Sequence, residues 1–479
     1  MRLRFSPHII LAAAFLTFST QAQDHSKLDV LFIAVDDLND WVGVLEGHPQ
    51  AQTPNIDALA ARGTLFTNAH SNAALCNPSR TSLMLGLRPS TLGIYGNNPN
   101  WMEIESLAEL PTIPRFLRDQ GYSTFGAGKI YHAHTFYESG FYGYNDPSSW
   151  DDFYPSLGRQ LPDEVTPINR PVNGNPIDPR FDWGPVVVDD RAMGDGQVTN
   201  WIQSQLMTEF NTPRFTAIGI FRPHLPWYVP KRYFDMYPLQ EIILPVVPEN
   251  DLDDLPELPL NSATFERHAF LPPREIHQWS IESNKWSEGV QAYLASVSFA
   301  DAMVGRVLDA LDKSGRADNT IIILWSDHGW HLGEKHRWRK TTLWEESTRV
   351  PFIIVAPGIT TPGTRSSRTV SLIDIFPTVA ELVGLQPPDY LEGASLVPLL
   401  RNPDASWDNA AISTFGFGNH SVRTEDFRYI RYIDGSEELY DHHRDPNEWD
   451  NLANDPSYTD VVLELRKWIP EQNAPDLAN

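Results

Sequence analysis

Cys76 is the residue of this sequence with the clearest capacity for chemistry, because it is the only cysteine among 479 residues. A single cysteine cannot form an internal disulfide, so it is either a reactive thiol or a small buried side chain. Asn77 is expected to cap a helix, with Pro78 in its first turn and Gly86 at its end. Cys76 would then lie at a helix N-terminus, which favours an anion, and Arg80 adds a positive charge.

Side chains that can bind a cation follow two predicted strands. Each strand is a short apolar run, typical of a strand buried on both faces of a parallel sheet. Burying two adjacent carboxylates at the carboxyl end of such a strand costs free energy unless a cation binds them. The alternative is a solvated turn, where an Asp pair is also common. The apolar runs are 28–35 and 319–325, and the residues that follow them are Asp36, Asp37, Asp327 and His328.

Three further segments place basic and histidine side chains just after predicted strands. The glycine-rich run 126–132 contains Lys129 and His132, but it lacks the spacing of a phosphate-binding P-loop. His224 lies in the sequence Arg-Pro-His-Leu-Pro, and Lys340 follows Asp-His-Gly-Trp-His-Leu-Gly-Glu. For Lys129, His132 and His224, each taken alone, an ordinary surface or loop side chain is the favoured explanation.

These motifs and their order resemble the type I sulfatases, in particular the iduronate-2-sulfatase-like members. The resemblance rests on Asp-Asp after the first strand, Thr-Pro-Asn-Ile-Asp at 53–57, Cys-x-Pro-Ser-Arg, Gly-Lys-x-x-His, Arg-Pro-His-x-Pro and Asp-His-Gly, and it covers most of the chain. It implies that a maturation enzyme oxidises Cys76 to formylglycine, an aldehyde whose hydrate is the nucleophile. The second hydroxyl of that hydrate lets the sulfated intermediate collapse, which a cysteine could not do.

The resemblance also implies a role for each of the other residues. Arg80 and Lys129 would orient the hydrate, while His132, His224 and Lys340 would balance charge on the sulfate and help to protonate the leaving oxygen. One divalent cation, expected to be Ca²⁺, would be held by Asp36, Asp37, modified Cys76, Asp327 and His328. Most sulfatases have Asp-Asn where this chain has Asp-His, and calcium prefers oxygen ligands, so the identity of the cation stays open.

The expected fold is α/β: a large mixed, mostly parallel sheet sandwiched by helices, as in alkaline phosphatase, with a small C-terminal α+β subdomain. We expect a catalytic domain at 23–400 and the subdomain, with its antiparallel sheet, at 401–479. Further strands are predicted at 66–69, 122–125, 215–220, 350–355, 411–414, 421–423, 428–432 and 438–441. Helices are predicted at 53–62, 112–120, 195–208, 288–311, 371–382 and 461–468, whereas 140–185 shows mainly loop chemistry.

Residues 1–22 have the charged end, apolar stretch and small-residue cleavage site of a signal peptide, which predicts an exported protein, periplasmic or secreted. No apolar run is long enough to span a membrane. The formal net charge of −25 argues against nucleic acid or an anionic membrane as a partner. An anionic substrate would therefore need a local basic pocket.

The resemblance thus implies a sulfuric ester hydrolase whose substrate is a sulfated carbohydrate. A uronate-containing polysaccharide such as ulvan is the first expectation, and a glycosaminoglycan of the iduronate-2-sulfated type is the second. Trp330, His331, Arg337 and Arg339 follow the second ligand pair, and some of them are expected to line the pocket mouth. The alternatives are a phosphodiester or phosphonate monoester hydrolase of the same superfamily, and a sugar-binding protein rich in tryptophan.

Overall fold

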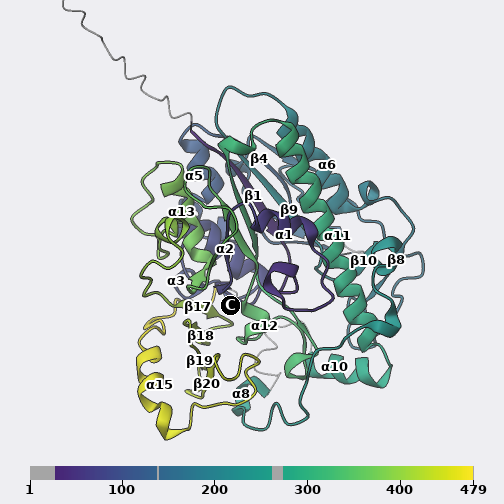
Figure 1. Cartoon of the computed structure of the whole chain (residues 1–479), viewed down its shortest axis with the longest axis vertical. Helices are drawn as coiled ribbons and strands as arrows, with labels where there is room; N and C mark the ends of the chain where they lie inside the picture. The colour runs from purple at the N-terminus through teal and green to yellow at the C-terminus, as the bar shows by residue number, and fades with distance from the viewer. Residues whose placement is uncertain (1–26, 137–139, 261–272, 478–479) are drawn as a thin grey trace, which may run out of the picture.

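The computed structural model describes residues 27–136, 140–260 and 273–477. The predicted signal peptide lies outside these residues. Within them, the largest sheet has eight strands in the order β15-β2-β14-β11-β1-β9-β4-β7 (Figure 1). Their bounds are Thr364–Ser366, Thr64–Phe66, Phe352–Val355, Thr320–Ser326, Asp29–Val35, Arg214–Ile220, Ser123–Gly128 and Asp152–Tyr154 in that order.

The sheet is mixed but mostly parallel, which confirms the expected fold class. β1 pairs in parallel with both β11 and β9, and β4 continues the parallel order on the far side of β9. β14 runs antiparallel to β11 and β2. The carboxyl ends of β1 and β11 therefore lie side by side, with Val35 opposite Ser326.

Helices cover both faces of this sheet because its central strands are apolar on both sides. Alternate residues of β1 pack into two different cores: Leu31 and Ile33 into one, Val30 and Phe32 into the other. One face carries α1 (Pro54–Ala60), α6 (Gly194–Met207) and α11 (Trp286–Lys313). The other face carries α2 (Cys76–Leu85), α5 (Ile113–Asp119) and α13 (Ile375–Leu382) (Figure 1).

Three local predictions were wrong in detail. α2 begins at Cys76 with Leu75 in the capping position, so Asn77 lies inside the helix, where its Oδ1 accepts from Thr81 Oγ1 at 3.1 Å and its Nδ2 donates to the carbonyl oxygens of Gly96 and Pro99. The single strand predicted at 66–69 is two short strands, β2 and β3 (Ala69–His70), in different sheets. The strand predicted at 122–125 extends through the glycine-rich segment before Lys129 and is β4, Ser123–Gly128.

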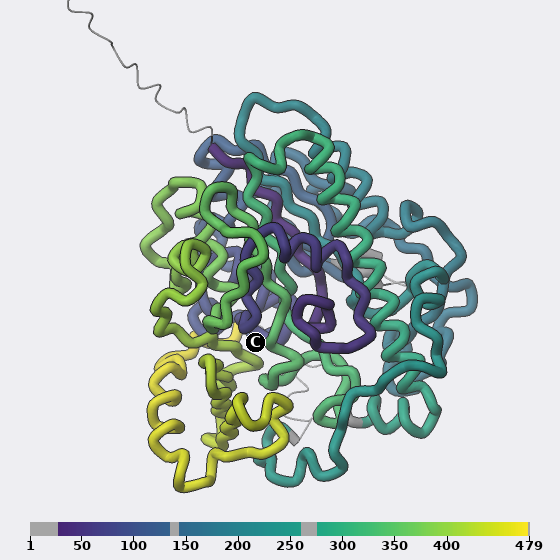
Figure 2. Tube along the Cα trace, in the orientation of Figure 1, coloured from purple at the N-terminus to yellow at the C-terminus, as the bar shows by residue number. Residues whose placement is uncertain are grey.

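The C-terminal part is a four-stranded antiparallel sheet in chain order, with one helix against it (Figures 1 and 2). Its strands are β17 (Ala411–Thr414), β18 (His420–Arg423), β19 (Phe427–Arg431) and β20 (Glu437–Asp441), and the helix is α15 (Thr459–Arg466). One face of the sheet packs on α15 through Val422 and Leu439. The other face packs on Trp344 and Leu343, which belong to the part of the chain that contains the large sheet, called the catalytic part below after the domain expected at 23–400.

The remaining elements are short, including three strands in the region 140–185. These are β6 (Gly140–Gly143), β7 and β8 (Trp183–Val186), with β6 paired to β5 (Ala133–Phe136) and β8 to β10 (Trp227–Pro230). The other strands are β12 (His331–Leu332), β13 (Trp338–Arg339) and β16 (Val370–Ser371). The other α-helices are Pro89–Leu92, Glu105–Ala108, Lys231–Phe234, Glu257–Leu260, Pro273–Glu282, Glu345–Thr348 and Val397–Arg401. No helix in the described ranges combines the length and apolarity needed to cross a bilayer.

Candidate active site

The two predicted ligand pairs meet at one edge of the large sheet. Asp36 and Asp37 follow β1, and Asp327 and His328 follow β11; all four are fully buried. Asp37 has a left-handed backbone conformation, with φ of 59°. This conformation lets its N–H donate to Asp327 Oδ1 at 3.1 Å, so the two strand ends are directly linked.

Cys76 faces this edge from the first turn of α2. Its Sγ lies 3.3 Å from His328 Nε2, 3.0 Å from Lys340 Nζ and 3.8 Å from Lys129 Nζ. Lys340 Nζ also donates to Asp37 Oδ1 at 2.6 Å. The thiol predicted to become the nucleophile is thus surrounded by the predicted ligands and by two ammonium groups.

Arg80 lies one turn further along α2 and bridges the two strand ends. Its Nε donates to Asp327 Oδ2 at 2.8 Å and its Nη2 to Asp36 Oδ1 at 2.9 Å. Lys129 Nζ donates to the other oxygen of Asp36 at 2.5 Å. The guanidinium and ammonium groups therefore fix both carboxylates in position.

Close backbone contact places Lys129 in the site. A Cβ on Gly128 would lie 2.1 Å from the carbonyl oxygen of Gly219 on the neighbouring strand β9, and Gly128 has φ of +75°. The N–H of Lys129 donates to that same oxygen at 2.9 Å. These glycines are therefore needed for strand packing and not for a phosphate-binding loop.

The pKa values in the site follow from burial opposed by the neighbouring charges. Burial raises the pKa of Asp36 to about 7 although Lys129 opposes it, and burial also raises the pKa of Asp37. For Asp327, Arg80 and His328 outweigh burial and hold its pKa well below the usual range. Burial opposes ionisation of the Cys76 thiol, but Lys129 and Lys340 together lower its pKa to about 7.

The two histidines assigned to the sulfate lie close to the same cations. Burial, followed by Lys129 and Lys340, holds the pKa of His132 and of His224 well below the ordinary value. His224 Nδ1 lies 2.6 Å from the Leu225 carbonyl oxygen, which can only accept, so Nδ1 carries the proton. Nε2 of His224 then faces Asp37 Oδ2 at 3.8 Å.

The residues present fit a divalent cation. One ligand atom from each of Asp37, Cys76, Asp327 and His328 lies within 4.8 Å of the others, and Asp37 Oδ2 is buried without a hydrogen-bond partner among the described residues. His328 Nδ1 lies 3.0 Å from the carbonyl oxygen of Gly329 and must carry the proton, which leaves the Nε2 lone pair available as a ligand. Asp36, which is paired with Arg80 and Lys129, is close to Asp37 and His224.

The charges of the site also suit an anionic ester. Three carboxylates are balanced by three cationic side chains, so a divalent ion bound here would make the site positive. It would supply the local basic pocket that an acidic protein needs for an anionic substrate. The carboxylates are those of Asp36, Asp37 and Asp327, and the cations are Arg80, Lys129 and Lys340.

Several residues that hold the site were not found from the sequence. Ser79 Oγ donates to the Asp327 carbonyl oxygen at 2.6 Å. In the turn around Asp37, Ser326 Oγ accepts from the Leu38 N–H and Tyr293 Oη donates to the Asp37 carbonyl oxygen. Ser79 is the serine of the Cys-x-Pro-Ser-Arg motif and Ser326 directly precedes Asp327, whereas Tyr293 lies within a long apolar helix and carries no local signal. Of the residues expected at the pocket mouth, Arg337 instead donates to the Pro259 carbonyl oxygen and Arg339 pairs with buried Asp178.

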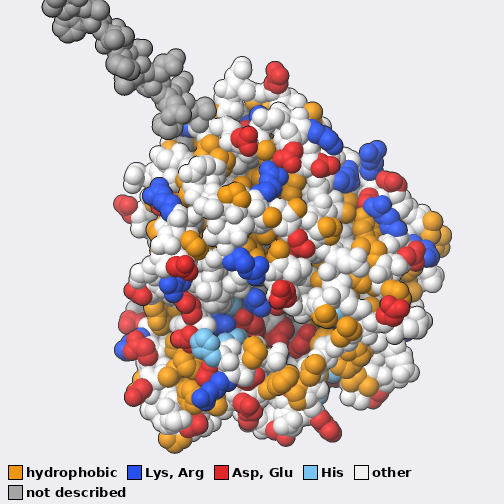
Figure 3. Space-filling view, viewed as in Figure 1, with side chains coloured by type: hydrophobic (Ala, Val, Ile, Leu, Met, Phe, Trp, Pro, Cys, Tyr) orange, Lys and Arg blue, Asp and Glu red, His pale blue; other side chains and the backbone are white. Residues whose placement is uncertain are grey.

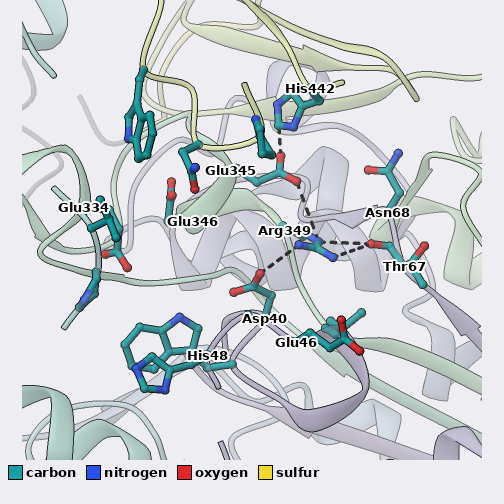
Figure 4. Close-up of a pocket in the computed structure, with 18 of the residues that line it drawn as sticks. Asp40, Glu46, His48, Thr67, Asn68, Glu334, Glu345, Glu346, Arg349 and His442 are labelled. Carbon is teal, nitrogen blue, oxygen red and sulfur yellow. Dashed lines mark hydrogen bonds and ion pairs between the residues drawn. The ribbon is translucent and has the colours of Figure 1, made fainter. Parts of the chain in front are cut away.

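A separate cavity of about 720 Å³ lies between the catalytic part and the C-terminal sheet. Figure 3 shows acidic side chains gathered in a hollow on this face. In Figure 4, Arg349 lies between Asp40 and the backbone of Thr67, and Glu345 faces His442. This cavity is distinct from the cluster around Cys76.

The cluster of Glu345, His442 and Glu448 beside this cavity has metal-like spacing, but arginines already neutralise it. Arg428, fully buried, donates to both Glu345 and Glu448, and Arg423 donates to Glu345 at 3.2 Å. Burial opposes ionisation of both glutamates, yet these cations and His442 lower the pKa of each. The group is therefore a buried ion network that joins the C-terminal sheet to the catalytic part.

Comparison with known proteins identifies relatives that span nearly the whole chain. The family model described as Sulfatase matches residues 29–385, and that of N-sulphoglucosamine sulphohydrolase, C-terminal, matches residues 333–474. A sulfatase from Formosa agariphila is 39% identical over 94% of this chain and 87% of its own length. Human iduronate 2-sulfatase is 32% identical over 79% of this chain and 74% of its own.

Two further comparisons bear on substrate and fold. An ulvan-active sulfatase from Formosa agariphila is 27% identical over 93% of this chain and 81% of its own. The solved phosphonate monoester hydrolase of Agrobacterium radiobacter has a TM-score of 0.75 and 24% identity, covering 92% of this chain and 94% of its own. That last likeness concerns the fold alone.

Proposed function

Because the chain belongs to the sulfatase family and is a sulfuric ester hydrolase, we propose that it removes O-sulfate from a uronate-containing carbohydrate, with ulvan-like material as the first candidate. The observation that carries the proposal is the placement of Cys76 among three carboxylates, three permanent cations and His328 at one sheet edge. The names of two relatives, an ulvan-active sulfatase and an iduronate 2-sulfatase, favour a sugar that bears a carboxylate.

We further propose that the active form contains formylglycine at position 76, made by a maturation enzyme, and one divalent cation, Ca²⁺. Asp36, Asp37, Asp327, His328 and the modified residue 76 would hold the cation, which supplies charge neutralisation for the sulfate oxygens. The aldehyde of formylglycine, once hydrated, supplies the nucleophilic hydroxyl. Residues 1–22, outside the described ranges, would direct export to the periplasm or beyond the cell.

The chain's own residues position the ester and move the proton. Lys129 and Lys340, which contact the sulfur of Cys76, would bind the anionic sulfate and favour an ionised nucleophile at that position. His224 Nε2 faces the same space, and His132 lies near the same two lysines, so either imidazole, once it has taken up a second proton, would be placed to deliver that proton to the leaving sugar oxygen. An incoming sulfate would oppose the cations that depress their pKa values.

Sulfate release from matched substrates tests the proposal. We expect a sulfated ulvan oligosaccharide to be hydrolysed with a higher kcat/KM than its carboxyl-reduced counterpart, and a glycosaminoglycan disaccharide to rank second. Equal kcat/KM on the two ulvan forms, or better turnover of neutral carrageenan-type or fucan-type sugars, would contradict the uronate preference. Faster hydrolysis of an aryl phosphate diester or a phosphonate monoester than of an aryl sulfate would favour the alternative chemistry seen in the solved structural neighbour.

A further inference from the structure

The turn that carries Asp37 is held by two hydroxyl groups from elements far away in the sequence. Tyr293, fully buried about two turns into α11, donates its O–H to the Asp37 carbonyl oxygen at 2.8 Å. The same oxygen of Tyr293 accepts from the N–H of Asn39 at 3.0 Å. Tyr293 therefore bonds to the turn on both sides of Leu38.

Ser326 binds the same turn from the neighbouring strand. Its Oγ accepts from the Leu38 N–H at 3.0 Å and donates to the His328 carbonyl oxygen at 3.0 Å. Ser326 is fully buried and is the last residue of β11. One hydroxyl thus joins the backbone of the loop that carries Asp37 to the backbone of the loop that carries His328.

The turn needs such support because Asp37 has a φ of 59°, in the left-handed region that residues other than glycine adopt only uncommonly. In this conformation the Asp37 carboxylate points to Cys76 and Lys340, and its buried Oδ2 has no hydrogen-bond partner among the described residues. Relaxation toward an ordinary backbone conformation would turn that carboxylate away from the other ligands.

Tyr293 also contacts the segment that carries His224. Its ring packs edge-on against Trp41 and against Trp227, with centroid separations of 5.5 and 5.6 Å. The Trp227 indole N–H donates to the Pro223 carbonyl oxygen at 2.6 Å, next to His224. Through Tyr293, helix α11 therefore supports both the turn that carries Asp37 and the segment that carries His224.

We propose that Tyr293 and Ser326 are positioning residues for the divalent cation: their hydroxyls hold the Asp37 turn in its ligating conformation. This inference rests on the cation site of the proposed function. Groups that orient metal ligands without touching the metal typically contribute 10–100-fold to metal affinity. We therefore expect their loss to weaken cation binding by about 10–100-fold while the fold is retained.

The test uses two conservative variants and two matched controls. Tyr293→Phe and Ser326→Ala each remove one hydroxyl from the turn. Tyr237→Phe and Ser298→Ala remove the two hydroxyls of another buried pair, which bond each other at 2.6 Å where Tyr237 packs on α11. Each protein is prepared with its maturation enzyme, stripped with chelator and titrated with Ca²⁺ in a calorimeter, and its melting temperature is recorded without the cation.

We expect the Ca²⁺ dissociation constant to rise by about 10–100-fold in Tyr293→Phe and Ser326→Ala and to stay at the parent value in both controls. Should one site variant fail to fold, the other still reports on the same turn. Parent affinity in the folded site variants, with only the melting temperature lowered, would show a merely structural role and overturn the inference. A parent protein that binds no divalent cation would instead contradict the cation site, and the positioning role with it.

Discussion

Cys76 combines features that a structural cysteine does not need. It is buried, yet two ammonium groups contact its sulfur and lower the thiol pKa to about 7. A cysteine in an apolar core would instead have a raised pKa and be inert. The environment therefore stabilises negative charge at this position, as a sulfate-transfer site requires.

His224 is expected to act in the chemical step and not in folding. Replacing it with alanine should lower kcat by about 10²–10⁴-fold on a sugar sulfate, because a poor leaving oxygen needs a positioned proton donor. The loss should be smaller on p-nitrophenyl sulfate, whose leaving group needs no proton. Steady-state kinetics on the two substrates measure this difference, and equal losses on both would remove His224 from the role of proton donor.

At the scale of elements, the site depends on the carboxyl ends of β1 and β11, which lie side by side. The sequence predicted both ligand strands and the cysteine segment because apolar runs and motif order are local features. It could not place Tyr293 or the Ser326 contact with Leu38, because these bonds join residues 256 and 288 positions apart. The cap predicted at Asn77 was also wrong: Asn77 lies inside the helix, its Oδ1 accepts from Thr81, and its N–H donates to Asn97 Oδ1, which lies 20 positions away and which no local pattern places.

The junction between the C-terminal sheet and the catalytic part gives a prediction about stability. Arg428→Met should destabilise the protein by about 3–5 kcal/mol, because it leaves Glu345 and Glu448 buried with fewer cationic partners. Arg368→Met is a suitable control, since Arg368 pairs with Glu425 at the surface, where such pairs contribute little. Calorimetric melting of the three proteins at pH 7 measures the effect, and equal melting temperatures for Arg428→Met and its control would contradict it.

The same network predicts a pH dependence. Glu345 and Glu448 have lowered pKa values in the folded protein, so their contribution is present above the unfolded value of about 4.3 and is lost as pH falls through the folded values. The melting temperature of the parent should therefore fall on acidification below about pH 4 more steeply than that of Arg428→Met, in which those pKa values are less depressed. Parallel curves for the two proteins would show that the pairing does not set the acid sensitivity.

For the whole molecule, cation binding should contribute to stability as well as activity. Asp36, Asp37 and Asp327 lie close together in a buried site, and an ion held by this arrangement would bind only the folded chain. Saturation at about 100 times the dissociation constant should stabilise the protein by about 2.7 kcal/mol. Melting curves with excess chelator and then with excess Ca²⁺ check this: a midpoint that does not respond to either would contradict the assigned ligand set.

The account depends most directly on the chemical state of residue 76. The measurement is peptide mass spectrometry of the segment that contains residue 76, on protein produced with and without a formylglycine-generating enzyme, alongside sulfate release by each preparation. We predict formylglycine at position 76 in the active preparation, activity in proportion to its fraction, and an inactive but folded protein when Cys76 is unmodified. Full activity in protein that carries only unmodified Cys76 would contradict the account.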